Sequence, residues 1–332
     1  MKHLVILAPN WLGDAVMALP AIADVCRASS GASIAVAARA AIAPLFSLVP
    51  GIDETIVLPR AATIGRIGGW RSIGAELASR NFDTALLLPN SIHAALVAAR
   101  ANIAERWGYR SGWRGRLLTR AVRRPAKLHQ AAYYQHLVEA LGFPNGPVEP
   151  RVVVPDAARE AGARILRIAG WDGAAPLVAL APGAAYGGAK RWPPAYFAEL
   201  ATLLAGDGVT CVLVGSSADA PTAMAIKRLC SGALDIVGQT DLPALAGVMT
   251  QCRGLVTNDS GAMHLAAAAG TSVTAVFGPT NETATRPLGD AHVVLTNPVW
   301  CRPCMLRECP IDHRCLRGIH APTVAEAARR TL

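Results

Sequence analysis

Short runs of apolar and β-branched residues alternate with helical stretches along this chain, and the alternation occurs twice. The first half contains four such runs, at residues 4–7, 33–36, 55–58 and 84–88. The second half contains six, at residues 177–180, 210–214, 235–237, 254–257, 273–277 and 293–295. Between the first two runs, apolar residues at helical spacing predict an amphipathic helix over residues 14–28. Strands that alternate with helices in this way predict parallel sheets covered by helices on both faces.

A segment rich in Pro and Gly, GFPNGPVEPRVVVP at residues 142–155, separates the two halves and predicts an interdomain linker. Helices are expected after it at residues 157–169, 194–205, 220–229, 242–249 and 262–269. We therefore expect an α/β protein with two Rossmann-like, doubly wound domains, residues 1–155 and 156–322. Ligands bind at the carboxyl ends of the strands in such folds. A central cleft faced by both sheet edges is thus the expected ligand site.

Composition indicates a folded, cytoplasmic protein. Of the 332 residues, 52% are apolar and 17% are charged, which is typical of a globular chain long enough for two domains. No apolar run reaches the roughly 18–20 residues that span a bilayer. The apolar N-terminus loosely imitates a signal peptide, but Asn10 and Asp14 interrupt it. We interpret residues 4–8 as the first strand instead, and expect a cytoplasmic location.

The net charge of +9 favours an anionic partner, such as a nucleotide, a phosphorylated glycan, anionic lipid or nucleic acid. Much of this charge lies in residues 100–127, where Glu105 opposes a series of arginines. Trp107, Tyr109 and Trp113 lie among them and could stack on bases. The chain shows no recognisable nucleic-acid module, so we expect no nucleic-acid partner. The alternative for these arginines is a solvated surface.

The stretch TNDSGAMHLAAAAGTSVTAVFGPT, residues 257–280, is the most specific motif. A predicted strand leads into a helix of small residues, and the free N–H groups at a helix start bind anions. Gly261 would let the backbone approach a phosphate, and Ser260 could donate a hydrogen bond to it. Alternatively, Asp259 or Ser260 caps the helix. A second Gly turn, residues 277–280, follows the next strand at the same sheet edge and favours a nucleotide-diphosphate site.

The stretch APGAAYGGAKRWP, residues 181–193, is a second candidate for binding an anion. A predicted strand runs into a glycine-rich loop that carries Lys190 and Arg191, whose charge suits a leaving diphosphate. The chain has no P-loop motif. It also has no GxGxxG motif after its first strand, which argues against a standard NAD enzyme.

Two acids each admit two interpretations. Asp219 follows a strand and a Gly turn in VLVGSSADAP, residues 212–221, where it could hold ribose hydroxyls or cap the next helix. Asp14 lies in NWLGDAVMALP, residues 10–20, directly after the first predicted strand. Its carboxylate could cap a helix or act as a general base.

Four of the eight cysteines cluster near the C-terminus, with His313 nearby: Cys301, Cys304, Cys309 and Cys315. A C-x2-C pair followed by two more cysteines could bind zinc or an iron–sulfur cluster. We expect free thiols or a disulfide instead, and no metal. The scattered Cys26, Cys211, Cys230 and Cys252 are expected to be reduced.

Four motifs together resemble one family. They are NWLGDAVMALPAI, APGAAYGGAKRWP, VLVGSSADA and TNDSGAMHLAAAAGTSVTAVFGPT. The chain resembles the lipopolysaccharide heptosyltransferases of glycosyltransferase family 9, specifically their ADP-heptose:lipopolysaccharide heptosyltransferase II branch, over nearly its whole length and in the family's motif order. The resemblance implies a GT-B fold, inverting transfer from ADP-heptose, and no metal or cofactor. It also implies a final helix, residues 323–332, that packs back toward the N-terminal domain.

The resemblance implies roles for residues at matching positions. Asp14 would be the general base, and Lys190 would assist catalysis at the donor phosphates. The donor site would comprise Gly183, Lys190, Asp219, Asp259, Ser260, Gly261, His264, Gly278, Pro279 and Thr280. The acceptor site would comprise Asn10, Trp11, Gly13, Arg110, Arg114 and Arg116.

We therefore expect an enzyme that transfers L-glycero-D-manno-heptose from ADP-heptose to the first heptose of the lipopolysaccharide inner core. The acceptor, a phosphorylated Kdo-lipid A core, would pair with the arginines of residues 100–127. The enzyme would then work in peripheral contact with the inner face of the inner membrane. The alternatives are transfer of the first or a later heptose, a sugar-nucleotide epimerase, and a non-catalytic anion-binding protein.

Overall fold

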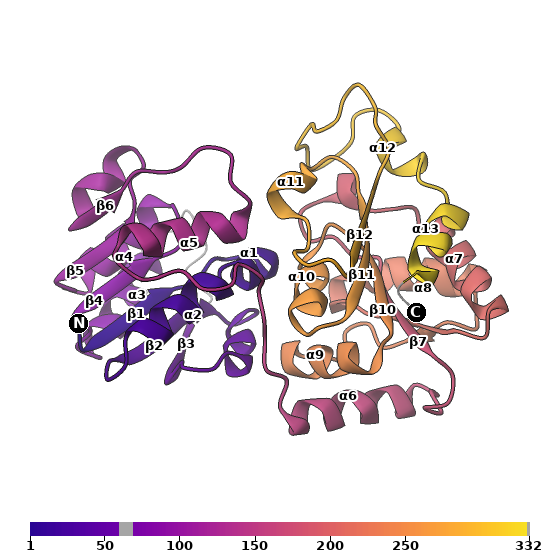
Figure 1. Cartoon of the computed structure of the whole chain (residues 1–332), viewed down its shortest axis with the longest axis horizontal. Helices are drawn as coiled ribbons and strands as arrows, with labels where there is room; N and C mark the ends of the chain where they lie inside the picture. The colour runs from indigo at the N-terminus through magenta and orange to yellow at the C-terminus, as the bar shows by residue number, and fades with distance from the viewer. Residues whose placement is uncertain (60–68, 331–332) are drawn as a thin grey trace. The chain divides into compact units, whose positions relative to one another are not determined.

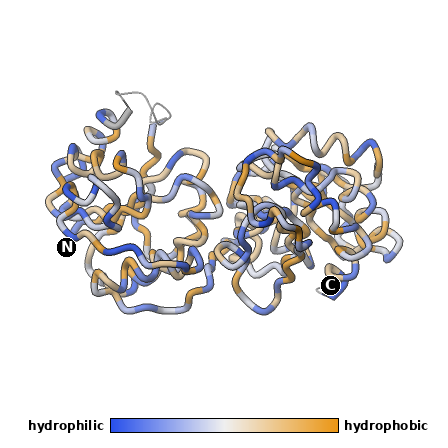
Figure 2. Tube along the Cα trace, turned by 90° about the horizontal axis from the view of Figure 1, so that it is seen from above, coloured by the Kyte–Doolittle hydropathy of each residue, from blue (hydrophilic) through white to orange (hydrophobic). Residues whose placement is uncertain are grey.

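The computed structural model describes residues 1–59 and 69–330. The chain forms two compact domains, Met1–Val152 and Val153–Leu332, which divide inside the segment rich in Pro and Gly. Each domain is a parallel sheet with helices on both faces, so the predicted doubly wound α/β class is confirmed (Figure 1). Figure 2 shows hydrophobic stretches running through the inside of each domain. Within the described ranges, no helix is long and apolar enough to cross a membrane.

The described part of the first domain contains a six-stranded sheet with the order β3-β2-β1-β4-β5-β6. Its strands are β1 (His3–Leu7), β2 (Ser33–Arg39), β3 (Glu54–Leu58), β4 (Thr84–Leu87), β5 (Glu105–Tyr109) and β6 (Arg120–Val122). In the central pairings Leu4 lies opposite Ile34 of β2 and Thr84 of β4, and both pairings are parallel. The central strands are near-continuous buried apolar runs because helices cover both of their faces.

Helices of the first domain pack in pairs. Val5 and Leu7 of β1 face α3 and α4, whose buried side chains complete one core. Helices α2 and α5 pack against each other. In the described part of this domain, the helices and 3-10 turns are α1 (Leu12–Met17), α2 (Leu19–Ala28), η1 (Ala43–Leu48), α3 (Gly69–Ala78), α4 (Ile92–Arg100), η3 (Gly112–Leu117) and α5 (Gln130–Ala140).

The single helix predicted over residues 14–28 was wrong in one respect, because the structure has two helices there, α1 and α2. The break falls at Ala18, just before Pro20, which occupies the first turn of α2. Proline has no N–H to donate and is best tolerated in the first turn of a helix, so it marks the start of a new one.

The basic stretch, residues 100–127, contains strands β5 and β6, which the sequence pattern did not reveal. Half of Arg106 is buried, and its guanidinium donates to the carbonyls of Ile103 and Leu117. Arg120 stacks on the Trp107 ring, 5.0 Å from its centroid. Some of the arginines in this stretch therefore bond or stack within the sheet. Because they occupy strand positions, β5 and β6 do not form the apolar runs by which the other strands were predicted.

The second domain contains, in its described part, a six-stranded parallel sheet with the order β12-β11-β10-β7-β8-β9. Its strands are β7 (Leu177–Ala181), β8 (Thr210–Leu213), β9 (Leu234–Asp235), β10 (Gly254–Asn258), β11 (Ser272–Phe277) and β12 (His292–Thr296). Its helices and 3-10 turns are α6 (Asp156–Ile168), η4 (Gly188–Lys190), α7 (Pro194–Gly206), η5 (Ser217–Asp219), α8 (Ala220–Leu229), α9 (Leu242–Gln251), α10 (Gly261–Ala268), α11 (Glu282–Thr285), α12 (Arg314–Arg317) and α13 (Ala321–Arg329).

Helices α6 and α9 approach each other backbone to backbone. A Cβ at Gly247 would collide with the carbonyl of Ala158, and one at Gly162 would collide with the backbone of Val248. The two glycines therefore make this close packing of α6 on α9 feasible.

The final helix, α13, begins at Ala321 and buries Val324, Ala325 and Ala328 in the second domain's core. Packing of residues 323–332 back toward the first domain stays a prediction. Helix α13 packs on α7. Trp192, which precedes α7, belongs to the same core. The apolar side of α13 is covered in this way, while residues 331–332 lie outside the described ranges.

Candidate active site

The topology of each sheet marks one place where a ligand can bind. Strand order reverses between β1 and β4 in the first domain and between β7 and β10 in the second. Loops that leave such a pair of strands run in opposite directions and open a crevice at their carboxyl ends. Asp14 follows β1, Lys190 follows β7 and Asp259 follows β10, so three of the predicted site residues stem from these strands.

A buried cluster lies at the second of these places. Lys190 lies in the glycine-rich loop, residues 182–191, and its Nζ is 2.6 Å from Oδ2 of Asp259. Thr280, which follows β11, donates its hydroxyl to the same carboxylate oxygen over 2.7 Å. The Lys190 and Asp259 side chains are only 14% and 7% exposed. The structure thus brings together predicted residues from two separate motifs, residues 181–193 and 257–280.

Asn258 fixes the loop that carries Lys190, and sequence reasoning gave it no such role. Its Oδ1 accepts from the Trp192 N–H over 3.0 Å, and its Nδ2 donates to the Pro182 carbonyl over 2.7 Å. Both ends of the glycine-rich loop are therefore tied to one buried amide at the end of β10. These contacts join residues more than sixty positions apart, so no local pattern could have predicted them.

The start of α10 follows β10 directly, beside Asp259. Ser260 is its N-cap, and its hydroxyl accepts from the Met263 N–H over 3.4 Å, so the capping interpretation is confirmed for Ser260. It is wrong for Asp259, which pairs with Lys190 instead. The first amides of an α-helix have no intrahelical partner, and Gly261 adds no side chain in front of them. His264 is buried one turn later.

The turn after β11 completes this side of the site. Gly278, Pro279 and Thr280 are all buried, and Gly278 packs so closely on Leu316 that a Cβ would not fit. The turn therefore presents mostly backbone, together with the Thr280 hydroxyl that bonds to Asp259.

The Asp219 side chain makes no capping bond to the next helix, α8, so the capping prediction is wrong; it bonds back to the start of its own 3-10 turn, η5. Its Oδ2 accepts from both the N–H and the hydroxyl of Ser216, over 3.0 and 2.8 Å. The same carboxylate lies against the α-carbon of Gly183, where a Cβ would collide with it. Asp219 thus stands beside the glycine-rich loop, at the position where a ribose-binding acid is proposed.

Asp14 lies in the first turn of α1 and is half-buried. The N-cap of this helix is Trp11, which makes no side-chain capping bond, so Asp14 is a first-turn acid and not the cap. A carboxylate in the first turn interacts favourably with the helix dipole. Burial, with a contribution from the nearby charge of Asp14, raises the pKa of Tyr134 on α5. Asn10 and Trp11 are exposed beside it, and Gly13 is half-buried.

The predicted acceptor arginines separate into two groups. Arg110 and Arg116 are exposed, and Arg116 stacks over Trp113 at 4.2 Å from the ring centroid. Arg114 is 1% exposed, and burial lowers its pKa to about 10. The alternative interpretation as a solvated surface is therefore wrong for Arg114.

Arg114 instead supports the end of β4. Its guanidinium donates to the Leu87 carbonyl over 3.3 Å and lies 3.4 Å from Oδ1 of Asn90. Asn90 also donates to the Tyr133 hydroxyl over 2.7 Å. Asn90, which sequence reasoning missed, is thus held at the carboxyl end of β4, where strand order reverses.

Other arginines of the basic stretch line a hollow of about 470 Å³ on the first domain. Its walls are Arg110, Ala121, Arg123 and Arg124. Three arginines thus line one hollow, and guanidinium groups bind phosphate and carboxylate groups in many proteins.

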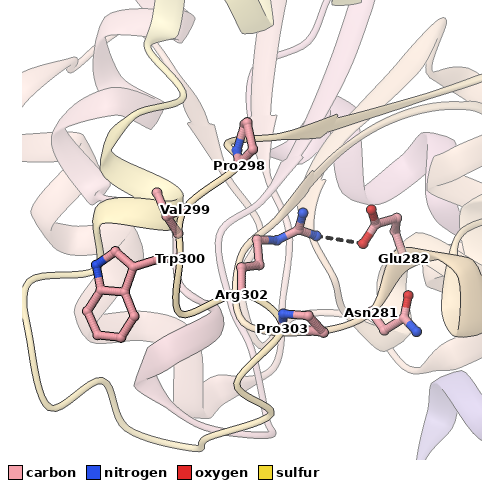
Figure 3. Close-up of a pocket in the computed structure, with 7 residues that line it drawn as sticks. All are labelled: Asn281, Glu282, Pro298, Val299, Trp300, Arg302 and Pro303. Carbon is pink, nitrogen blue, oxygen red and sulfur yellow. Dashed lines mark hydrogen bonds and ion pairs between the residues drawn. The ribbon is translucent and has the colours of Figure 1, made fainter.

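The four C-terminal cysteines are free thiols. Cys301, Cys304 and Cys309 are half-buried in an exposed loop, whereas Cys315 belongs to the second core. Across residues 1–59 and 69–330, no group of three or more His, Cys, Asp or Glu side chains is arranged to hold a metal ion. Beside this loop is an open pocket of about 500 Å³, where Arg302 pairs with Glu282 over 2.6 Å (Figure 3).

The chain is similar to known proteins in both sequence and fold. Residues 70–314 match the family model described as glycosyltransferase family 9 (heptosyltransferase). The chain is 32% identical over 304 residues to lipopolysaccharide heptosyltransferase 2 of Salmonella typhimurium. The aligned region covers 87% of this chain and 86% of the Salmonella protein. The solved ADP-heptose lps heptosyltransferase II of Escherichia coli is 29% identical, with a TM-score of 0.83 over 100% of this chain and 98% of the other. A family 9 glycosyltransferase from Veillonella parvula shares the fold, with a TM-score of 0.86 at 22% identity over 99% and 97% of the two chains.

Proposed function

Because this chain belongs to glycosyltransferase family 9, the heptosyltransferases, we propose that it transfers L-glycero-D-manno-heptose from ADP-heptose to the first heptose of the lipopolysaccharide inner core. One observation carries the proposal: Lys190, Asp259 and Thr280 form a buried cluster beside the start of α10. A cation and free helix amides at one sheet edge are suited to a diphosphate, the group that leaves when heptose is transferred.

In the donor half of the mechanism, the bond between the anomeric carbon and the diphosphate oxygen breaks, and negative charge grows on the departing ADP. The Lys190 ammonium and the α10 amides stabilise that charge, so the site needs no metal or cofactor for this step. Ser260 and Thr280 line the phosphates and Asp259 lines the heptose, with Gly183 and the Gly278–Pro279 turn leaving room for them. Asp219 accepts from the ribose hydroxyls, and His264 lies behind the first turn of α10.

In the acceptor half, a heptose hydroxyl attacks the anomeric carbon and inverts it. The hydroxyl proton passes to the Asp14 carboxylate, which acts as the general base. Asn10, Trp11 and Gly13 surround the attacking sugar, and Arg110 and Arg116 meet the phosphate and Kdo carboxylate groups of the core. Arg114 supports Asn90 from inside the domain and has no contact with the acceptor in this proposal.

The acceptor is attached to lipid A, so we place the enzyme at the cytoplasmic face of the inner membrane as a peripheral protein. Family membership favours a transferase over the sugar-nucleotide epimerase and the non-catalytic binding protein that the sequence also suggested. The alternative within the family is transfer of the first or a later heptose. The identity of 32% to a heptosyltransferase named 2, against 26% to one named 1, favours the second position.

The test measures ADP release from ADP-heptose with two acceptors, one core that carries the first heptose and one that carries none. The wild type should release ADP with the first acceptor only, and Asp14→Ala should release little with either. Stimulation by the heptose-free core would make the enzyme a heptosyltransferase for the first position. If neither acceptor stimulates ADP release, the proposed function is wrong.

A further inference from the structure

A loop far along the chain packs on the glycine-rich loop. Residues 301–309, named here the cysteine loop, bond to it at three points. The Tyr186 hydroxyl donates to the Met305 carbonyl over 2.8 Å. The Ala189 N–H donates to the Arg307 carbonyl over 2.9 Å, and the Gly188 N–H donates to Oε1 of Glu308 over 3.0 Å. The residues directly before Lys190 are therefore held by this loop.

The cysteine loop also holds the turn after β11. Arg302 donates from Nε to the Gly278 carbonyl over 2.6 Å and from Nη2 to the Thr280 carbonyl over 3.2 Å. Its side chain is 10% exposed, and Glu282 pairs with it, as Figure 3 shows. The Met305 N–H adds a bond to the Pro279 carbonyl over 2.9 Å.

The two anchored segments meet at Asp259. Lys190 comes from one and Thr280 from the other, and both bond to the same carboxylate oxygen. A lysine on a loop has a long flexible stem, and ordering such a side chain costs rotamer entropy. The cysteine loop fixes both segments that bond to Asp259, the glycine-rich loop and the Gly278–Thr280 turn. Lys190 therefore loses less conformational entropy when the donor binds.

We propose that the cysteine loop is a positioning element for the donor site, with Arg302 and Glu308 as its positioning residues. Arg302 sets the Gly278–Thr280 turn, and Glu308 sets the glycine-rich loop, so that Lys190 is already aimed at the diphosphate. This inference rests on the proposed role of Lys190 toward the donor phosphates. Neither Arg302 nor Glu308 touches the substrate in this arrangement.

The experiment compares Arg302→Ala, Glu308→Ala and Glu308→Gln by the Kd of ADP, the KM of ADP-heptose and the KM of the acceptor. Arg302→Ala should weaken ADP binding about tenfold, because a charged donor to two carbonyls is lost. Glu308→Ala should weaken it about threefold, since an exposed charged acceptor contributes less. Glu308→Gln should stay within about twofold of wild type, because its amide oxygen can still accept from Gly188. The acceptor KM should not change.

The control is Glu326→Ala, which removes an exposed carboxylate of α13 that pairs only with Arg330 among the contacts described for it. It should leave ADP binding unchanged. If Arg302→Ala does not fold, the test uses the two Glu308 variants together with Tyr186→Phe, which removes the bond to Met305. Equal ADP affinity in wild type, Glu308→Ala and Tyr186→Phe would overturn the proposal.

A double-mutant cycle with Lys190→Ala separates this inference from the proposed function. Lys190→Ala alone should weaken ADP binding, and Glu308→Ala should have little further effect in that background. If Lys190→Ala weakens binding but Glu308→Ala alone does not, the positioning role is wrong and the donor role of Lys190 stands. If Lys190→Ala leaves ADP binding intact, the donor role itself is wrong. An equal Glu308→Ala effect in both backgrounds would mean general damage to the loop and would also overturn the proposal.

Discussion

Lys190 and Asp259 form a buried ion pair across two loops of the second domain, with Nζ and Oδ2 2.6 Å apart. A lone buried charge is costly, so each of these groups depends on the other while no diphosphate is present. The pair thus holds a cation in the site until an anionic ligand arrives.

Asp259→Asn should destabilise the free enzyme by about 3 kcal/mol, because the largely buried Lys190 ammonium loses its counter-charge. The diphosphate of ADP would supply that charge, so ADP should raise the Tm of the variant more than it raises the Tm of wild type. Thermal unfolding with and without ADP measures both effects. The matched control is Asp207→Asn, whose exposed pair with Arg329 should contribute at most about 1 kcal/mol. Equal losses of Tm in the two variants would contradict the expectation.

Asp14→Asn should lower kcat by about 10² to 10⁴-fold, since the amide cannot take the proton of the attacking hydroxyl. ADP binds without that proton transfer, so its Kd should not change. Steady-state kinetics and ADP titration give the two numbers. Glu139→Gln, an exposed carboxylate on α5 of the same domain, should behave as wild type. A variant Asp14→Asn with wild-type kcat would rule out the base assignment.

Arg123→Gln with Arg124→Gln should raise the KM of a phosphorylated acceptor, because two of the three guanidinium groups around the hollow are removed. Salt screens charge pairs at such a surface because it shortens the Debye length. The wild-type KM should therefore rise as NaCl is raised from about 50 to about 500 mM, and the variant's KM should rise less. The KM of ADP-heptose should be unaffected. An acceptor KM that the double substitution leaves unchanged would argue against this hollow as a phosphate site.

Gly247→Ala should destabilise the second domain by about 1–3 kcal/mol, because the new methyl group collides with the Ala158 carbonyl of α6. Gly206→Ala is the control, since a Cβ there meets no atom within 4 Å. Chemical unfolding of both variants measures the difference. A Gly247→Ala variant as stable as Gly206→Ala would mean that the two helices can separate slightly at no cost.

The N-terminus should be held less firmly at low pH. Asp83 is partly buried, which raises its pKa, but bonds from the Thr84 hydroxyl and the Lys2 and His3 amides outweigh this and leave its pKa below the ordinary value. The resulting stability is present above the unfolded pKa of about 3.9 and is lost as the pH falls through the lower folded value. Asp83→Asn should therefore be less stable than wild type at pH 7, by about 1 kcal/mol, and the difference should shrink below pH 4. A difference that stays constant from pH 7 to pH 3 would contradict this account.

The sequence predicts the fold class well because buried parallel strands are short apolar runs, and these are visible in residues 4–7 and 254–257. It fails at β5 and β6, where arginines occupy positions of the sheet edge and conceal the pattern. It also fails to divide α1 from α2, although Pro20 offers a local signal that could have been used.

The candidate site is predicted in part. Lys190, Asp259 and Thr280 come from motifs that sequence alone singles out, and the structure joins them. The roles of Asn258 and Arg302 could not be predicted, because their bonds cross 20 or more positions and depend on which strands are neighbours. Arg114 shows the converse: its residue type suggested a surface ligand, but its burial is decided by tertiary packing over Gly108.

The two sheets have the same strand order, because numbering the second sheet from β7 gives the same 3-2-1-4-5-6 arrangement as the first. Asp14 and Lys190 therefore occupy equivalent places, each in the segment after the opening strand of its half, and Asn90 and Asp259 follow the fourth strand of each. One architecture therefore presents opposite charges at the same place: a carboxylate follows the opening strand of the first sheet, and an ammonium group follows the opening strand of the second. In the proposed mechanism, proton acceptance and anion binding are thus assigned to different domains.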